Sequence, residues 1–494
     1  MNNIDIIIIS VYLFFILYVG FYSRKYVTDF SGFMVAGRNV GLSLGVVTML
    51  GTELGLITVM YNAQTGITGF FASFHIGLAA FIVTMLIGLT GFVIVKLRRL
   101  KVKSIPEYYN LRFGKNVRIV GAILLCLGGI LNMGLFLRVG AIFIQSIFGF
   151  DDNAILIIMA FLLILVLIYT ISGGMISVII TDYIQYLVLS IGFLLSVFFS
   201  VQYFGWNNIF TILENIDIDN HKLQYDVIYN PIQNKGIAYI SWQVVLGFVS
   251  AVIWPTAITR ALSIKEVAMV KKQYMWSSIS FLIRFVVPCF LGICAFVYFN
   301  TNPDYIGDSY NTLSLMPLYL SEILPVGVLG LVVAGMLAAF MSTHDSYLLC
   351  WSTIITNDII EPLSGKKISS NKKITITRLI ILLLGCYIFI WGMFYEGSDA
   401  IWDYLGITGA IYFTGAISVV VMGIYWEKAS STGAILALLG GFSAILGLEP
   451  IRDLVGLDLN NPSLVGLCTL FLSMLLMILG SIIFPDSNKR IKKI

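Results

Sequence analysis

Residues 41–61 read GLSLGVVTMLGTELGLITVMY, an apolar run with one acidic residue, Glu53, near its centre. A helix needs about 20 apolar residues to cross the hydrocarbon of a bilayer, so this run is long enough. Gly51 and Gly55 flank Glu53, and this pattern indicates that the helix unwinds locally. Unwound backbone is tolerated in a membrane where it lines a cavity, and its carbonyls can then bind a cation. The alternative is a packing kink with Glu53 protonated or snorkelling.

The composition of the whole chain is that of a membrane protein. Of 494 residues, 59% are hydrophobic and only 11% are charged, with a mean hydropathy of +0.94. Soluble domains are about one quarter charged, so a soluble protein is excluded. Three histidines and six cysteines without CxxC spacing exclude a zinc-finger or disulfide framework. We expect the cysteines, which all lie in apolar runs, to be packing residues: Cys126, Cys289, Cys294, Cys350, Cys386 and Cys468.

Apolar segments long enough to span recur along the chain and predict an all-α polytopic membrane protein with about 13 transmembrane helices. The first segment has no basic residues before it, so we expect a retained helix and no cleaved signal peptide. The longest polar loop is expected at about 204–236. The segments lie at about 4–22, 41–61, 69–95, 117–149, 153–173, 176–203, 239–260, 274–299, 323–350, 374–395, 400–425, 431–448 and 464–484.

The basic residues predict the orientation of these segments. If the N-terminus lies outside, alternate segment ends are cytoplasmic, and those ends hold 25 of the 30 Lys and Arg residues. Cytoplasmic loops carry an excess of Lys and Arg, so we expect an N-out, C-in topology. The cytoplasmic ends include Arg24 and Lys25, residues 96–118, and the terminal Lys489, Arg490, Lys492 and Lys493.

Ionisable residues within the predicted segments are functional candidates. On insertion scales such a residue costs at least about 2.5–3.5 kcal/mol at the centre of the bilayer. They are Glu53, His75, Arg138, Asp182, Arg284, His344 and Asp345.

A second polar stretch, Ala338-Ala339-Phe340-Met341-Ser342-Thr343-His344-Asp345-Ser346, lies in the ninth segment. At 100° per residue four of its residues form one stripe with Asp345 beside it: Ala339, Ser342, Thr343 and Ser346. Hydroxyls and a carboxylate suit a hard cation such as Na⁺, and the small residue 339 leaves its carbonyl accessible. Hydrogen bonding between helices by Ser and Thr explains these residues equally well.

A third stretch combines Gly173-Gly174 with Thr181-Asp182 and Gln185. The glycine pair indicates a tight turn, which places Asp182 about two turns into the next helix. An acid there is an ion ligand, a proton relay or the partner of a basic residue.

The order of these stretches resembles the sodium/solute symporter family, which includes bacterial proline, sialic acid, pantothenate and sodium–sugar cotransporters. No single motif is unique, but the ordered set is specific and covers nearly the whole chain. The resemblance implies one transporter domain over 1–494 with a LeuT-type inverted repeat of two five-helix halves, 41–203 and 239–425. A leading helix at 4–22 and two trailing helices in 431–484 complete it. The further matching motifs are Asp29-Phe30 to Ala36-Gly37-Arg38, Thr259-Arg260-Ala261-Leu262-Ser263, Asn357-Asp358, Gly423-Ile424-Tyr425-Trp426 and Thr432-Gly433-Ala434.

The resemblance also implies where Na⁺ binds. The family's shared site uses carbonyls of the broken first core helix with a carbonyl and two hydroxyls of the eighth, which here are Gly51, Leu54, Ala339, Ser342 and Thr343. Some members hold a second Na⁺, and the matching residues are Asp182, Ser342, Asp345 and Ser346. Asp345 stands where the sialic acid transporters have serine. The added negative charge makes the second site stronger, shifts it, or suits it to a proton.

Substrate contacts are implied near the break. Glu53 stands where proline transporters have an acid, and it is expected to meet a substrate amino group or to contribute to Na⁺ binding. Gly55 replaces a substrate-contacting serine, which we expect to open space. Arg138 lies about two turns from the position of the arginine that meets sialic acid, so that role is not assigned to it. For the other cavity candidates helix packing is as good an interpretation: Thr52, Thr58, Phe74, His75, Ser250 and Trp254.

These observations predict Na⁺-coupled symport of a small polar organic solute, which is amino-acid-like, a sugar or sialic-acid-like, into the cell by alternating access, with one or two Na⁺. A proton-coupled carrier is the nearest alternative. A transporter-derived sensor is less favoured, because only Pro485–Ile494 follows the last segment. Neither HExxH nor a Ser–His pair is present, so an enzyme is not expected. We expect a small-molecule substrate, the bilayer of a bacterial plasma membrane, no nucleic acid partner and a functional monomer.

Overall fold

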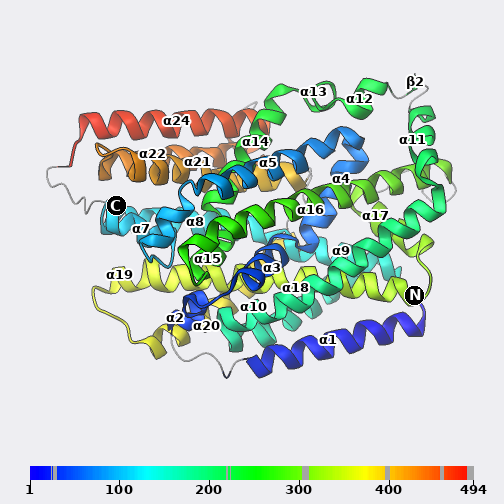
Figure 1. The fold of residues 1–494 in the computed structure, drawn as a ribbon, viewed down its shortest axis with the longest axis horizontal. Helices are drawn as coiled ribbons and strands as arrows, with labels where there is room; N and C mark the ends of the chain where they lie inside the picture. The colour runs from blue at the N-terminus through cyan, green and yellow to red at the C-terminus, as the bar shows by residue number, and fades with distance from the viewer. Residues whose placement is uncertain are drawn as a thin grey trace.

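The computed structural model consists almost entirely of α-helices, most of which run along one common direction (Figure 1). It describes residues 1–23, 25, 30–218, 221–222, 224–302, 311–394, 401–456 and 461–486. Long apolar segments fold as helices because a helix satisfies the backbone hydrogen bonds within the segment itself. The elements are α1 (Asn3–Ser23), α2 (Phe30–Val35), η2 (Ala36–Arg38), α3 (Leu42–Glu53), α4 (Leu56–Gly69), η3 (Phe70–Ser73), α5 (Phe74–Thr90), α6 (Ile94–Arg99), α7 (Ile105–Arg112), α8 (Lys115–Gly134), α9 (Phe136–Phe148), η4 (Asp152–Ala154), α10 (Ile155–Phe204), α11 (Trp206–Asn215), β1 (Asp217–Ile218), β2 (His221–Lys222), α12 (Tyr225–Tyr229), α13 (Pro231–Lys235), α14 (Ile237–Ile253), α15 (Pro255–Ser263), α16 (Val267–Thr301), α17 (Thr312–Ile323), α18 (Val328–Ile354), η6 (Ile355–Ile360), α19 (Glu361–Ser364), α20 (Ser370–Phe394), α21 (Ile401–Tyr425), α22 (Ser431–Phe442), η7 (Ser443–Gly447), α23 (Glu449–Val455) and α24 (Pro462–Ile483).

Ten helices of the described part of the chain are long and apolar enough to cross a membrane, or up to twelve if each of two bent pairs is one span. The bent pairs are Ile237–Ile253 with Pro255–Ser263, at 42°, and Ser431–Gly447 with Glu449–Val455, at 85°. The predicted number of thirteen differs because α3 has only 12 residues and because α4 and α5 form one apolar stretch, Leu56–Thr90. The number thirteen and the division into two five-helix halves stay predictions.

The helices differ in how deeply they are buried. In the most apolar 18-residue stretch of α18 and of α21, 89% of the residues are buried. The corresponding share is 28% for α1 and for α20 and 33% for α24. The first two helices therefore lie at the centre of the molecule and the other three at its periphery. Their exposed apolar side chains, such as Phe14 on α1, form the surface that suits contact with lipid.

Two sequence interpretations need correction. Cys386 and Cys468 are exposed, on α20 and α24, whereas the other four cysteines are buried as expected. Hydropathy cannot separate the two groups, because a surface that faces lipid is as apolar as the core. The loop expected at about 204–236 is not a simple loop, since it contains α11, the antiparallel pair of β1 with β2, α12 and α13.

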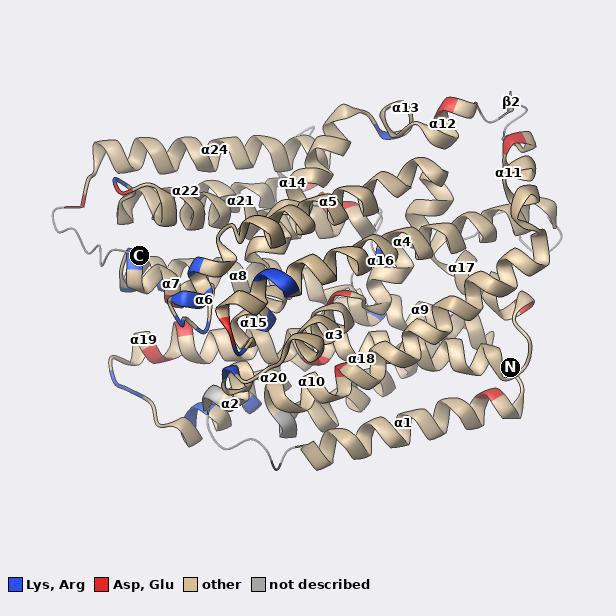
Figure 2. Ribbon diagram, viewed as in Figure 1, with Lys and Arg blue, Asp and Glu red and all other residues tan. Residues whose placement is uncertain are grey.

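Lys and Arg residues gather at one end of the molecule, around α6, α7 and α19, and the N-terminus lies at the other end (Figure 2). Here Arg98 donates to the carbonyl of Ile264 at 2.9 Å, and Arg118 forms an ion pair with Asp358 at 2.8 Å. Ser104 also donates to Asp358, at 2.7 Å. This end is therefore tied together by buried polar contacts. The membrane orientation itself stays a prediction. Arg24, Asp29 and the terminal basic residues, Lys489, Arg490, Lys492 and Lys493, lie outside the described residues.

Candidate functional site

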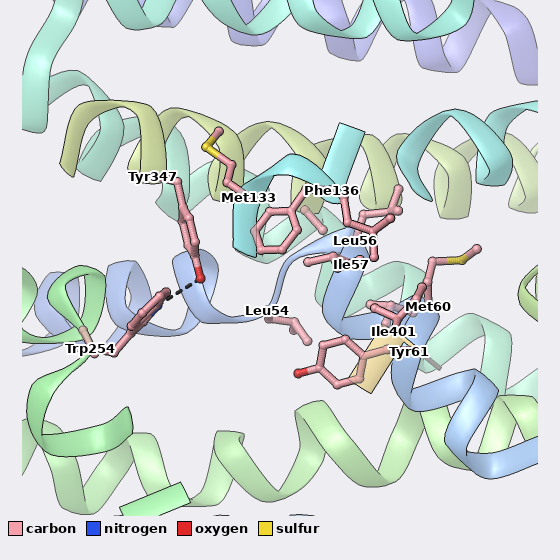
Figure 3. Packing of buried hydrophobic residues seen from close by; sticks show 14 of the residues in the cluster. Leu54, Leu56, Ile57, Met60, Tyr61, Met133, Phe136, Trp254, Tyr347 and Ile401 are labelled. Carbon is pink, nitrogen blue, oxygen red and sulfur yellow. Dashed lines mark hydrogen bonds between the residues drawn. The ribbon is translucent and has the colours of Figure 1, made fainter. Parts of the chain in front are cut away.

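The predicted break in the first core helix is present. Helix α3 ends at Glu53 and α4 begins at Leu56. Between them Leu54 has φ −98° and ψ 64°, and Gly55 has φ −80° and ψ 164°, so neither continues the helix. Figure 3 shows the chain passing from α3 to α4 beside Leu54. The helical hydrogen bonds are therefore interrupted near the middle of the molecule, and nearby carbonyls become free to accept other partners.

Gly55 does not open space for a substrate as expected. A Cβ atom on Gly55 would overlap the hydroxyl oxygen of Thr343 and lie only 3.0 Å from the Cβ of Thr343. The missing side chain is thus needed for close packing of the break against α18. The sequence indicates that a glycine frees space at position 55, but it does not show that α18 fills this space.

The hydroxyl stripe of α18 faces the break. The Ser342 Oγ lies 2.8 Å from the carbonyl oxygen of Gly51 and 3.1 Å from that of Ala339. The Thr343 hydroxyl donates to the carbonyl of Thr52 at 3.3 Å. Four of the five residues predicted for the first Na⁺ site therefore contact this interface, and the fifth, Leu54, forms the turn itself. The contacts include the hydrogen bonds between helices that were the alternative interpretation of this stripe.

Asp182 is the centre of a closed polar cluster between α10, α3 and α15. Its Oδ2 accepts hydrogen bonds from Thr48 at 2.6 Å, from Thr52 at 3.3 Å and from Arg260 at 3.5 Å. Asp182 and Arg260 are both completely buried. The positive φ of 56° at Gly174 bends α10 two turns before Asp182, as the glycine pair predicted. Of the three roles considered for Asp182, the structure supplies the basic partner.

Arg260 connects this cluster to α18. One of its terminal nitrogens also lies 2.5 Å from the Ser346 hydroxyl, which is 3.2 Å from the Thr52 hydroxyl. In the sequence, Arg260 stands out only as part of the motif Thr259–Ser263, so its role as the partner of Asp182 was missed. The available signal was that Asp182 needs a compensating charge at this depth.

Asp345 lies in the same region, and its two oxygens have different donors. The Tyr169 hydroxyl donates to Oδ2 at 2.7 Å, and the Ser346 hydroxyl donates to Oδ1 at 3.1 Å. The structure thus brings together Asp182, Asp345 and Ser346 of the predicted second Na⁺ site. Tyr169 and Arg260, which sequence reasoning missed, join them. Ser342 instead contacts the carbonyl of Gly51 at the helix break. Within the described residues, several buried polar atoms have no hydrogen-bond partner. They include Oδ1 of Asp182 and both polar atoms of the Gln185 side chain.

Glu53 points into a different environment, where its carboxylate has two partners. Its Oε2 forms an ion pair with Arg284 of α16 at 3.2 Å, and its Oε1 accepts from Thr256 of α15 at 2.8 Å. The two charged side chains are 13% and 11% exposed, respectively. Sequence reasoning marked both residues as ionisable at membrane depth but did not pair them.

A cavity lies beside this ion pair, between the break and helices α5, α14, α16 and α21. Aromatic rings form much of its wall, and the indole of Trp254 donates to the Tyr347 hydroxyl at 2.9 Å across the region shown in Figure 3. Five predicted substrate residues line it: Thr52, Glu53, Thr58, Ser250 and Trp254. The lining residues that sequence reasoning did not propose for this role include Tyr61, Asn132, Gln243, Arg284, Trp402 and Phe413.

Other candidates lie away from the cavity. Phe74 and His75 are not among its lining residues, and the Nδ1 of His75 contacts the carbonyl of Ala72 at 2.6 Å. The Nδ1 of His344 likewise contacts a carbonyl of its own helix, that of Phe340, at 2.8 Å. Arg138 donates to the carbonyl of Gly392 at 3.1 Å. These contacts hold His75, His344 and Arg138 in the helix packing away from the cavity.

Comparisons with known proteins agree with this arrangement. A sequence model described as "Sodium:solute symporter family" matches residues 33–441. The sodium/sialic acid symporter SiaT of Proteus mirabilis is 26% identical and the alignment covers 90% of this chain and 89% of that protein. The sodium/proline symporter 2 of Staphylococcus saprophyticus is 24% identical, with coverages of 98% and 95%.

Among solved structures, a substrate-bound, outward-open Na⁺-coupled sialic acid symporter matches with a TM-score of 0.84 at 21% identity, covering 99% of this chain and all of that one. MhsT in complex with L-phenylalanine matches with a TM-score of 0.55 at 14% identity, covering 88% and 97%. These likenesses show that the chain has the LeuT-like fold of such transporters.

Proposed function

The chain belongs to the sodium:solute symporter family, and from that premise we propose that it carries a small polar organic solute into the cell together with Na⁺ by alternating access. The family implies Na⁺ coupling, a small-molecule substrate and embedding in a membrane, and its members are transporters and not enzymes. A functional monomer in a bacterial plasma membrane, without a nucleic acid partner, is part of the proposal. The observation that carries it is the contact of the Ser342 hydroxyl with the Gly51 carbonyl at the helix break, at 2.8 Å.

Sodium is proposed to bind at this contact between the broken helix and α18. Its ligands would be the carbonyl oxygens of Gly51, Leu54 and Ala339 and the hydroxyls of Ser342 and Thr343, because hard cations prefer oxygen ligands. The ion would replace hydrogen bonds between α3 and α18 and hold the break in an ordered form. Solute then binds in the adjacent cavity, the gates close, and the helix bundle rocks to release Na⁺ and solute inside.

The cluster of Asp182, Asp345, Ser342 and Ser346 is proposed to take part in coupling. If both acids are ionised, two negative charges face the single positive charge of Arg260, which leaves one surplus negative charge in a buried place. A second Na⁺ or a proton would neutralise it. Each charge moved through 100 mV supplies about 2.3 kcal/mol, enough for about fiftyfold accumulation, so this second ion matters for the driving force.

Sodium binding can be tested without knowing the solute. The thermal midpoint of purified protein is measured in Na⁺ and in K⁺, since a ligand that binds only the folded state raises it. We expect stabilisation by Na⁺ in the wild type and its loss in Ser342→Ala. Ser190→Ala is the matched control, because within the described part of the chain that hydroxyl donates to its own helix, to the carbonyl of Tyr186 at 2.7 Å. Equal Na⁺ stabilisation of Ser342→Ala and the control would reject the site.

A proton-coupled carrier of the same fold remains the second candidate. It is favoured by Asp345, a completely buried acid whose Oδ2 contacts the Tyr169 hydroxyl at 2.7 Å. In proteoliposomes, Na⁺ and pH gradients imposed separately distinguish the two. Accumulation driven by a pH gradient in the absence of Na⁺ would favour the proton.

A further inference from the structure

The cavity contains a single pair of opposite charges. Among its lining residues in the described chain, only Glu53 and Arg284 are charged, and their nearest atoms lie 3.2 Å apart. Both side chains are more than a tenth exposed. The pair is therefore accessible to a solute that enters the cavity. Asp182 and Arg260, in contrast, are completely buried.

Each member of the pair is held by its own surroundings. Thr256 donates to Oε1 of Glu53 at 2.8 Å. The guanidinium of Arg284 lies over the rings of Phe281 and Phe285, with its central carbon 4.7 Å and 4.8 Å from their centroids. The two charges can therefore separate by a small distance and keep other favourable contacts.

Among the described residues, two residues that line the cavity have an N–H donor without an acceptor. The Nε of Arg284 is buried without a partner, and so is the indole Nε1 of Trp402. The Trp402 ring packs against Phe285 at 6.0 Å and against Tyr61 at 4.6 Å between centroids. Buried donors normally have acceptors, so two unpaired N–H groups in the wall of one cavity indicate an acceptor group on its occupant.

The charge of the pair restricts the charge of that occupant. A singly charged solute would leave one unbalanced charge in a wall that is largely apolar, which is unfavourable. A neutral sugar would separate the ion pair without replacing either charge. A zwitterion brings both charges and leaves the sum at zero.

We propose that the substrate is a zwitterion of the amino-acid type, whose carboxylate binds Arg284 and the indole of Trp402 while its ammonium group binds Glu53. This inference rests on the proposed function and names the class of its solute. The aromatic rings of the wall, among them Tyr61 and Phe136, then contact the apolar part of the solute.

Matched solutes test the proposal in the wild-type protein. Thermal stabilisation in Na⁺ is measured with glycine, L-proline, L-leucine and L-phenylalanine, with the carboxamide and the des-amino acid of each, and with D-glucose and N-acetylneuraminate. We expect at least one amino acid to stabilise. Its carboxamide, without the negative charge, and its des-amino acid, without the positive charge, should each bind about tenfold more weakly or worse, because each loses a charge-assisted hydrogen bond.

Three variants assign the two charges. In Arg284→Gln the preference for the amino acid over its carboxamide should disappear while the preference over the des-amino acid persists, and Glu53→Gln should show the reverse. Trp402→Phe keeps the ring and should reduce only the preference over the carboxamide. Glu361→Gln, which breaks the pair with Lys373 away from the cavity, at 2.6 Å, is the matched control and should keep both preferences.

The outcomes separate this inference from the proposed function. Na⁺-dependent stabilisation by glucose, by N-acetylneuraminate or by a singly charged solute, with none by any amino acid, would overturn the zwitterion and leave symport intact. If Arg284→Gln and Glu53→Gln both keep the wild-type preferences for the amino acid over its carboxamide and its des-amino acid, the assigned contacts are wrong. Stabilisation by no solute, together with no difference between Na⁺ and K⁺, would overturn the proposed function itself.

Discussion

Among the described residues, two carboxylate–guanidinium pairs lie beside the helix break, and their surroundings differ. Asp182 and Arg260 are completely buried, and Thr48, Thr52 and Ser346 surround them. Glu53 and Arg284 lie in the wall of a cavity with more than a tenth of each side chain exposed. The enclosed pair can exchange partners only with an ion small enough to enter, whereas the cavity pair can exchange partners with an organic solute.

Consecutive residues of α3 connect the two pairs. Thr52 bonds to Asp182 at 3.3 Å, and the next residue, Glu53, ends α3 and carries the cavity pair. The helix break therefore lies between the proposed Na⁺-binding cluster and the proposed solute cavity. We propose that binding on one side changes the geometry on the other through this break.

The largest difference between the pairs is expected in stability. Arg260→Met leaves Asp182 and Asp345 buried without a compensating cation, which we expect to cost about 3–5 kcal/mol. Arg284→Met should cost about 1–3 kcal/mol, because water in the cavity can solvate Glu53. Thermal midpoints of the two variants, purified in the same detergent, measure this. Equal losses of stability in the two variants would show that water reaches the cavity pair no better than it reaches the buried pair.

The next difference is expected in ligand dependence. Asp182→Asn should raise the Na⁺ concentration for half-maximal stabilisation about tenfold or more, since it removes a negative charge from the proposed Na⁺-binding cluster. Glu53→Gln should change that concentration less than about twofold. Titrations of the thermal midpoint with Na⁺, at constant ionic strength with K⁺, measure both. If Glu53→Gln raises this Na⁺ concentration more than Asp182→Asn does, Glu53 and not Asp182 contributes to the ion site.

Local patterns were enough to predict the break and the stripe. Two glycines around an acid in an apolar helix indicate unwinding, and helical periodicity puts Ser342 and Thr343 on one face. Both properties depend on residues that are neighbours in sequence. The structure accordingly places the two hydroxyls against the carbonyls of Gly51 and Thr52.

The ion-pair partners could not be predicted in the same way. Arg284 is 231 positions from Glu53, and Arg260 is 78 positions from Asp182. A single sequence shows that a buried acid needs a compensating charge, but it does not show which of several basic residues the fold brings near. Tyr169, which is 176 positions from Asp345, was missed for the same reason.

A smaller effect is expected where the break meets α18. In Gly55→Ala the new methyl group must displace Thr343, which should cost about 1–3 kcal/mol by overpacking and weaken Na⁺ stabilisation. Gly41→Ala is the matched control, because no atom lies within 4 Å of a Cβ at that position. The same two measurements, midpoint and Na⁺ titration, apply. A Gly55→Ala protein with wild-type Na⁺ stabilisation would show that Thr343 does not contribute to the ion site.

The smallest change in stability is expected for Asp345→Asn, because the amide oxygen can still accept from Tyr169 and the volume is conserved. The charge nevertheless changes, since Arg260 then balances Asp182 alone. In the wild type, protons and Na⁺ compete for the surplus negative charge, so Na⁺ stabilisation should weaken as the pH falls. In Asp345→Asn it should be independent of pH over the same range. Na⁺ titrations of both proteins at acidic and alkaline pH measure this, and an unchanged pH dependence in the variant would place the surplus charge outside the buried cluster.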